Sequence, residues 1–177
     1  MNSKTLGNIN AVLRAKWYLR HATQVGSRVR IWGRPSITNN GQLIIGDRVR
    51  LVSTITKIEL VANKNGILEI GNGAYINYGC SISASQYVHI GPRCHIGTYV
   101  IMMDNDFHCV EPERRLEKPQ SMPIILEENV WIGARAIILR GVTIGAGSVI
   151  GAGSVVTKDI PCRTLAAGAP AQIIRRL

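Results

Sequence analysis

Residues 130–152 have the sequence VWIGARAIILRGVTIGAGSVIGA, and this stretch decides the fold. Within it and its flanks an aliphatic residue returns at every sixth position, at Leu126, Ile132, Ile138, Ile144, Ile150 and Val156. The buried face of a helix repeats about every 3.6 residues and that of a strand every two residues, so a period of six fits neither. Such a period is typical of a solenoid, in which each six-residue unit lays one short strand on one face of a prism.

The same period recurs upstream, and its aliphatic side chains are expected to point into the prism. It joins Val25, Ile31 and Ile37, then Ile70, Ile76 and Ile82, then Ile90, Ile96 and Met102. Small or β-branched residues stand four places after many inward residues, at Cys80, Cys94, Val130, Ala136, Val142, Ser148 and Ser154. A two-residue slip near 85–87 indicates a bulge or widened corner. The period is poorer between Leu43 and Ile70, where we expect coils with a loop near 63–66.

Length, charge and cysteines set further bounds. A chain of 177 residues suggests one domain with a sizeable core. The net charge is +10, and no acidic residue precedes Asp47. Because no nucleic-acid motif or interleaved aromatic residues accompany this charge, we expect no nucleic-acid partner. An anionic ligand, weak association with a membrane surface and a solvated face remain open.

The compartment can also be predicted from the sequence. We expect neither a transmembrane helix nor a signal peptide, because long apolar runs are missing. The four cysteines form no CxxC pair, which suggests reduced thiols in the cytoplasm or at the inner face of the membrane.

Three regions are expected: an N-terminal helical cap (1–24), the solenoid (25–160) and a C-terminal tail (161–177). A helix over about 2–23 would pack a broad apolar face on the open end of the solenoid. That face comprises Ile9, Val12, Leu13, Trp17 and Leu19. Docking at a membrane surface is the alternative use of this helix. Residues 103–123 break the repeat and contain three prolines, which predicts a loop extruded from the prism. Long loops on a rigid scaffold usually carry function.

At this point the sequence resembles a known family. The segments WIGARAIILRGVTIGAGSVIGAGSVVTKDIP and AAGAPAQIIR are similar to the hexapeptide-repeat acyltransferases, and the nearest branch is that of the sugar O-acetyltransferases, including galactoside and maltose acetyltransferases. The resemblance is strong over 70–177 and weak over 25–69. It implies an all-β fold, a left-handed parallel β-helix with a short N-terminal helix and an extruded active-site loop. It also implies a homotrimer and acetyl-CoA as acyl donor.

The resemblance assigns coenzyme contacts to the C-terminal half. Three six-residue units make one coil, so residues eighteen apart stack roughly 4.8 Å above one another. Gly133 and Gly151 therefore stack, as do Ala134 and Ala152, and they form a smooth groove for the pantetheine arm. The alternative is that they only turn corners. The complete predicted coenzyme set is Trp131, Gly133, Ala134, Gly151, Ala152, Thr157, Lys158 and Arg175. Gln172 departs from the arginine of the galactoside enzyme, and Arg163 or Arg176 would have to replace that contact.

The resemblance assigns catalysis to His108, in the DNDFH motif of the loop. A sugar hydroxyl attacks a thioester poorly unless a base removes its proton, and histidine suits this task. The alternative is a surface histidine. Asp104 and Asp106 could orient the imidazole, hold a sugar hydroxyl or simply form a turn. Asn77 matches an acceptor contact, whereas Ser85 replaces an aspartate of the galactoside enzyme and argues against the same acceptor.

The predicted activity is acetyl transfer to a sugar hydroxyl, in capsule, O-antigen or exopolysaccharide synthesis, without an acyl-enzyme. Sugar-nucleotide N-acetylation, xenobiotic acetylation and a non-catalytic binding solenoid are the alternatives. The short N-terminal region argues against serine acetylation. Cys109 shows no activating neighbour and is not favoured as a nucleophile. His89 and His95 are six residues apart, hence on successive faces, and we expect no metal.

Overall fold

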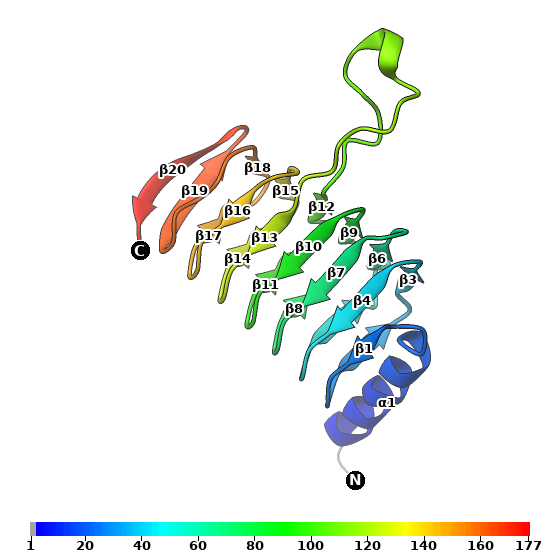
Figure 1. Cartoon of the computed structure of the whole chain (residues 1–177). Coiled ribbons are helices and arrows are strands. Elements are labelled where there is room, and N and C mark those ends of the chain that lie inside the picture. The colour runs from blue at the N-terminus through cyan, green and yellow to red at the C-terminus, as the bar shows by residue number, and fades with distance from the viewer. Residues whose placement is uncertain (1–2) are drawn as a thin grey trace.

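The six-residue units fold into coils that place one short parallel strand on each of three sheets (Figure 1). The computed structural model describes residues 3–177, so residue 2 of the predicted helix lies outside the described residues. Sheet A contains β1 (Gln24–Val25), β4 (Gln42–Ile45), β7 (Ile67–Ile70), β10 (Tyr87–Ile90), β13 (Ile124–Leu126) and β16 (Thr143–Ile144). Sheet C contains β3 (Ser36–Asn39), β6 (Glu59–Ala62), β9 (Ser81–Ala84), β12 (Ile101–Met103), β15 (Ile137–Ile138) and β18 (Val155–Val156).

Sheet B is the longest of the three and also receives the C-terminal segment. It contains β2 (Arg30–Gly33), β5 (Arg50–Ser53), β8 (Tyr75–Ile76), β11 (His95–Ile96), β14 (Trp131–Ile132), β17 (Val149–Ile150), β19 (Thr164–Gly168) and β20 (Ala171–Arg176). Strand β19 continues the parallel ladder, whereas β20 turns back and pairs antiparallel with it. Residues 164–176 are thus a hairpin at the end of the prism. The chain turns from sheet to sheet at three edges, called A/B, B/C and C/A below.

The interior confirms the six-residue period. Every predicted inward residue from Ile70 to Val156 is buried, and so are the small residues beside them. Cys80 and Cys94 are among these small residues, and burial raises the pKa of each thiol to about 11. The first coil departs from the prediction, because Val25 is 41% exposed and Ile37 is only partly buried. Val25 lies in the terminal two-residue strand of sheet A, where no further coil covers it.

The predicted slip near 85–87 is a corner between β9 and β10. The buried carboxylate of Asp104 fills it by accepting hydrogen bonds from the backbone N–H groups of Ser85, Gln86 and Tyr87, at 2.7, 2.7 and 2.8 Å. Farther upstream, residues 63–66 form a tight turn in which the N–H of Gly66 bonds to the carbonyl of Asn63.

The N-terminal helix is shorter than predicted and presents a different face to the prism. Helix α1 spans Ser3–Tyr18 and ends before residue 23, because Thr23 already donates its N–H to Leu43 at the start of the first coil. Ala11 and Ala15 of the helix and Leu19, directly after it, are buried, whereas Ile9, Leu13 and Trp17 are exposed. The predicted apolar face is therefore wrong for these three residues. Alanine lets the helix axis approach the end of the prism closely, which the larger side chains would prevent.

Candidate active site

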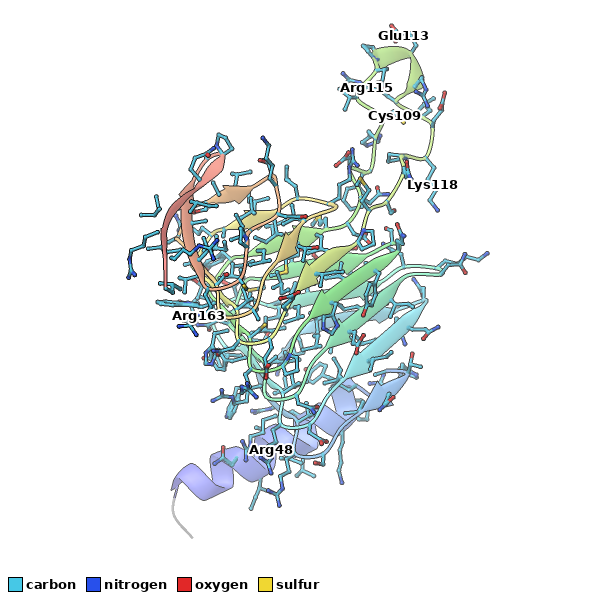
Figure 2. The ribbon with its side chains drawn as sticks, turned by 60° about the vertical axis from the view of Figure 1, so that its left-hand side comes forward. Arg48, Cys109, Glu113, Arg115, Lys118 and Arg163 are labelled. Atoms are coloured by element: carbon cyan, nitrogen blue, oxygen red, sulfur yellow. The ribbon has the colours of Figure 1, made fainter. Side chains whose placement is uncertain are left out.

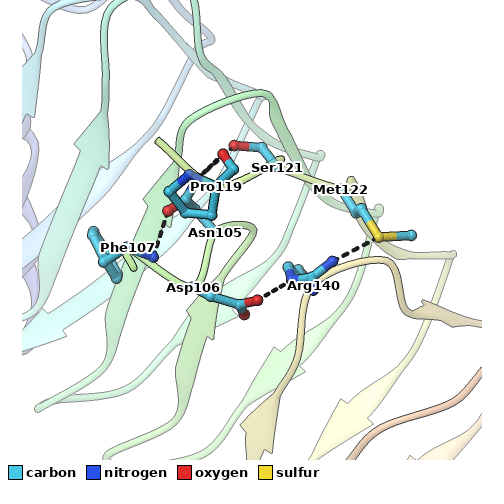
Figure 3. Close-up of polar contacts among 7 residues, drawn as sticks. All are labelled: Asn105, Asp106, Phe107, Pro119, Ser121, Met122 and Arg140. Carbon is cyan, nitrogen blue, oxygen red and sulfur yellow. Dashed lines mark hydrogen bonds and ion pairs between the residues drawn. The ribbon is translucent and has the colours of Figure 1, made fainter. Parts of the chain in front are cut away.

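A long loop interrupts the prism at the C/A edge. It connects β12 to β13 through residues 104–123, contains the short helix η1 (Pro112–Arg114), and projects away from the sheets (Figures 1 and 2). Asn105 closes its neck, since the buried amide donates to the Oγ of Ser121 at 2.8 Å and to the carbonyl of Pro119 at 3.4 Å. Beside it, Asp106 forms an ion pair with Arg140, which follows β15 (Figure 3). The two ends of the loop are thus fixed to each other and to the prism.

A strained turn carries His108 out of this neck. Phe107 has a φ of +62°, a region that costs a bulky residue on the order of 1–2 kcal/mol. The N–H of His108 bonds to the carbonyl of Asp106, two residues earlier, at 2.7 Å, as in a γ-turn. The side-chain oxygen of Asn105 accepts the N–H of Phe107 at 2.6 Å and holds the turn. Strain of this kind persists where surrounding contacts impose it, often at functional sites.

The imidazole of His108 has one nitrogen engaged and one free. Its Nδ1 lies 3.0 Å from the backbone carbonyl oxygen of Arg115. A carbonyl oxygen only accepts, so Nδ1 carries a proton in this contact, and in the neutral imidazole Nε2 is the nitrogen that keeps its lone pair. The side chain is exposed. This arrangement suits a group that takes a proton from a bound molecule.

A pocket of about 930 Å³ opens beside His108, between the loop and the C/A edge of the first three coils. Its lining includes three cationic side chains, Lys64, Arg115 and Lys118, and one acidic side chain, Glu117. Glu117 accepts two hydrogen bonds from Arg114, at 3.0 and 2.9 Å, so its charge is already matched. The pocket therefore carries excess positive charge. Nothing in the sequence pattern indicated Lys64 or Lys118.

The two aspartates predicted beside His108 are used elsewhere. Asp104 is fully buried in the 85–87 corner and cannot contact either a bound acceptor or the imidazole. Asp106 pairs with Arg140 and reaches His108 only through its backbone carbonyl. Of the roles left open for these two carboxylates, orientation of the imidazole falls in this structure to the carbonyl of Arg115, and Asp104 holds the backbone of the 85–87 corner. Ser85 lines the pocket, and its hydroxyl accepts a hydrogen bond from Asn63.

The predicted coenzyme groove lies on another edge. Gly133 and Ala134 follow β14, and Gly151 and Ala152 follow β17, so all four stack along the B/C edge. A Cβ on Gly133 would lie 2.5 Å from the backbone nitrogen of Ala152, so packing between coils alone already requires glycine there. The alanines remain partly or fully exposed and leave this edge smooth.

Asn77 and Trp131 accompany the groove, whereas the cationic residues lie apart from it. Asn77 follows β8 at the B/C edge and lies outside the pocket of His108. Trp131 is 57% exposed on the outer face of sheet B. Thr157 and Lys158 follow β18 at the C/A edge, on the same edge as the loop, and Arg175 is exposed on β20. One chain therefore places most of the predicted site residues on two edges, and Trp131 and Arg175 on sheet B.

Within residues 3–177, no three histidine, cysteine, aspartate or glutamate side chains are grouped as metal ligands would be. Helix α1 is neither long nor apolar enough to span a membrane.

This architecture defines a class: a solenoid of six-residue units, interrupted by one loop that bears a histidine. Comparison with known proteins agrees, since the hexapeptide repeat of succinyl-transferase matches residues 123–158. Galactoside O-acetyltransferase of Escherichia coli strain K12 is 40% identical over 110 residues, covering 62% of this chain and 54% of that protein. The chain spans about half the length of the curated relatives it matches.

Solved structures give the same result over more of the chain. A galactoside acetyltransferase in complex with coenzyme A superposes with a TM-score of 0.66 and 32% identity, covering 92% of this chain and 69% of the other. A hexapeptide-repeat acetyltransferase of Vibrio cholerae, complexed with acetyl coenzyme A, gives 0.68 and 28%, covering 94% and 77%. The chain belongs to the hexapeptide-repeat acyltransferase family, in the branch that includes the galactoside and maltose acetyltransferases.

Proposed function

We propose that the chain is an acetyl-CoA-dependent O-acetyltransferase that acts on a sugar hydroxyl, with His108 as general base. The observation that carries the proposal is the imidazole of His108, fixed at Nδ1 by the carbonyl of Arg115 and free at Nε2 beside a large pocket. The names of the relatives support the donor and the reaction, since one is a galactoside O-acetyltransferase and another was solved with acetyl coenzyme A. The four cysteines are free thiols, which suits a reducing compartment such as the cytoplasm.

The reaction follows from this arrangement. Nε2 of His108 takes the proton of the acceptor hydroxyl while the hydroxyl oxygen attacks the thioester carbonyl carbon. A backbone N–H of the groove at the B/C edge stabilises the oxyanion that forms. The tetrahedral intermediate collapses, the carbon–sulfur bond breaks, and the imidazolium returns its proton to the departing thiolate. The products are an acetyl ester and coenzyme A, and no acyl-enzyme is involved.

A second copy of the chain completes the site in this proposal. His108 and Lys158 belong to the C/A edge, whereas Ala134, Ala152 and Asn77 belong to the B/C edge. Both edges border sheet C. If sheet C of each copy faces a threefold axis, the C/A edge of one copy meets the B/C edge of the next, and the ring closes as a trimer.

The outer surface of sheet C supports this packing. Ile101 is 37% exposed there, and Ile137 and Val155 occupy neighbouring outward positions. Leu139, directly after β15, is 40% exposed. A row of aliphatic side chains on the outer surface of a sheet is costly in water and suits burial in an interface.

The excess charge of the pocket narrows the choice of acceptor. Lys64, Arg115 and Lys118 suit an acceptor that carries a carboxylate or phosphate near the acetylated hydroxyl. Such sugars occur as units of charged surface polysaccharides, which fits a role in capsule, O-antigen or exopolysaccharide synthesis. Sugar nucleotides also carry phosphates, so the pocket keeps sugar-nucleotide N-acetylation as the second candidate function.

The test is an acceptor screen with acetyl-CoA, followed through release of free thiol. Each anionic sugar is paired with its neutral analogue, and acetylated products are treated with hydroxylamine, which cleaves esters and leaves amides intact. The proposal predicts hydroxylamine-sensitive products, preferentially from the anionic sugars. A product that resists hydroxylamine, as an amide does, would contradict O-acetylation and support sugar-nucleotide N-acetylation instead. Failure of the chain to bind acetyl-CoA in calorimetry would contradict both.

A further inference from the structure

Helix α1 presents three large apolar side chains to solvent. Ile9, Leu13 and Trp17 are 46%, 57% and 65% exposed. Their spacing of four residues places them in one stripe, which we call the outer stripe. The opposite side of the helix is buried against the prism through Ala11 and Ala15. The outer stripe therefore lies on the side of the helix opposite Ala11 and Ala15, and two of its residues, Ile9 and Leu13, also border the prism at Arg30. Single exposed apolar residues are ordinary, but a contiguous row of three marks an interaction surface.

The N-terminal part of the chain is rich in cationic residues, and Arg20 and Arg30 lie beside the outer stripe. Residues 1–46 contain no acidic residue and seven cationic ones, Lys4, Arg14, Lys16, Arg20, Arg28, Arg30 and Arg34. The guanidinium carbon of Arg20 lies 4.6 Å from the centre of the Trp17 ring, at the end of the stripe. Arg48 lies near the same end of the molecule (Figure 2). Asp47, the first acidic residue in the sequence, accepts a hydrogen bond from the N–H of Ser27, which lowers the pKa of its carboxyl.

Two hollows between α1 and the first coil combine the same chemistries. One, of about 330 Å³, is lined by Ile9, Val12 and Leu13 together with Arg30. The Nε of Arg30 is buried and has no hydrogen-bond partner among the described residues. The other, also of about 330 Å³, is apolar except for Lys16, Ser27 and Arg28. Apolar hollows bordered by cations suit the acyl chain and phosphate of a phospholipid.

We propose that this end of the molecule docks on an anionic lipid surface, with α1 in the plane of the interface. Basic helices with tryptophan and leucine on one face bind in this way, and each cation near an anionic surface contributes about 1 kcal/mol. A polyanion in solution would use the charges but not the outer stripe. A second copy of the chain would bring the same positive charge and repel it. In the trimer of the proposed function, three such ends would face the same way and bind together, and this last point alone depends on that function.

The test is co-sedimentation of the full chain with vesicles. The probes are vesicles of phosphatidylcholine alone and vesicles with about 30% phosphatidylglycerol added. We expect the protein to sediment with the anionic vesicles only, less so as salt rises. The double variant Leu13→Gln/Trp17→Gln should lower the partition coefficient about tenfold or more, because its two side chains are exposed in the free protein and apolar contact is lost only on the membrane. The variant Arg14→Gln/Lys16→Gln should lower it as well.

Matched variants at the opposite end of the prism are the controls. Ile173→Gln/Ile174→Gln removes two aliphatic side chains that are 56% and 60% exposed, and Arg163→Gln/Arg176→Gln removes two charges. Both should leave sedimentation unchanged.

The proposal is overturned if the wild-type chain stays in the supernatant with anionic vesicles, or if the control pairs weaken binding as much as the α1 pairs. It is also overturned if Leu13→Gln/Trp17→Gln changes the mass in light scattering, since the outer stripe would then contact another copy. Dextran sulfate that binds wild type and this variant equally, and displaces both from vesicles, would indicate a simple polyanion site instead. None of these readouts depends on acetyl transfer.

Discussion

The imidazole of His108 and the backbone carbonyl of Arg115 are hydrogen-bonded at 3.0 Å, so the loop itself orients its histidine. Many catalytic histidines take their orientation from a carboxylate, which also stabilises the imidazolium. A neutral carbonyl fixes the tautomer and the direction of Nε2 but adds no negative charge. The residues that hold the loop closed, above all Asn105, therefore position the proposed base indirectly.

Replacing His108 with alanine should lower kcat by about two to four orders of magnitude, the usual contribution of a general base. The Kd for acetyl-CoA should change little, because the imidazole acts on the acceptor. Cys109→Ala is the matched control in the same loop and should keep nearly normal turnover. If the His108 variant kept near-normal turnover and the Cys109 variant lost it, the thiol of Cys109 and not the imidazole would be the catalytic group.

Asp104 should matter for stability rather than for chemistry. Its buried carboxylate satisfies three backbone N–H groups, and Asp104→Ala leaves them without partners. We expect the free energy of unfolding to fall by about 3 kcal/mol or more, measured by urea denaturation. Asp106→Ala removes a partly exposed ion pair with Arg140 and should cost about 1 kcal/mol or less. Equal losses in the two variants would contradict this assignment.

The core was predictable because the six-residue period of the sequence shows directly which side chains point into the prism. Once Ile132 and Ile150 are known to be stacked inward residues, the register of the whole coil follows. The end of helix α1 was not predictable in the same way. Residues 19–23 are compatible with a helix, but Thr23 bonds to Leu43, twenty positions away, and that tertiary contact decides the boundary.

The candidate site was predictable only in part. A histidine in the loop that breaks the repeat is a signal, and it made His108 the candidate base, which stays a proposal. The sequence does not say which of Asp104 and Asp106 turns into the 85–87 corner, because this depends on the path of a distant coil. No sequence signal indicates the role of the Arg115 carbonyl, since every residue has a backbone carbonyl. Lys64 joins the pocket only because coils stack.

The thiols should divide into two classes. Cys80 and Cys94 are buried, and burial raises the pKa of both to about 11, so few thiolates form at pH 8. Cys162 is exposed and Cys109 is partly exposed. A thiol reagent at pH 8 should therefore label two cysteines quickly in the folded protein and all four in denaturant. Mass spectrometry of the labelled peptides identifies them, and fast labelling of Cys80 would show that the core opens readily.

Lys158 and Arg175 should contribute to coenzyme affinity and not to folding. Both are exposed, and neither side chain belongs to the core. Each change to alanine should weaken acetyl-CoA binding by about 1–3 kcal/mol, the value of a charge-assisted phosphate contact. The free energy of unfolding without ligand, measured by thermal melting, should stay within about 0.5 kcal/mol of the wild-type value. Dephospho-CoA should show a smaller penalty if the contact is with the 3′-phosphate. Lower stability with unchanged affinity would assign both residues to the fold instead.

The division of the site between two edges gives a quantitative test of assembly. His108→Ala disables the C/A edge and leaves the B/C edge intact. Ala152→Trp fills the groove at the B/C edge, and because Ala152 is exposed the prism should tolerate it. Each variant alone should be inactive. In a mixed ring of three, one seam always joins the intact edges of two different copies. Random co-assembly at equal amounts should therefore restore about a quarter of wild-type activity.

The control for this experiment is His108→Ala co-expressed with the double variant His108→Ala/Ala152→Trp, which has no intact C/A edge and should stay inactive. Light scattering on the mixed sample should give the mass of a trimer. Each site would lie within a single chain if the first mixture regained no activity although pull-down through a tag on one variant recovered both variants. His108 and Lys158 lie on the C/A edge, and the carbonyl of Arg115 orients His108 there. Restored activity would therefore show that the groove which holds the acetyl donor belongs to the neighbouring copy.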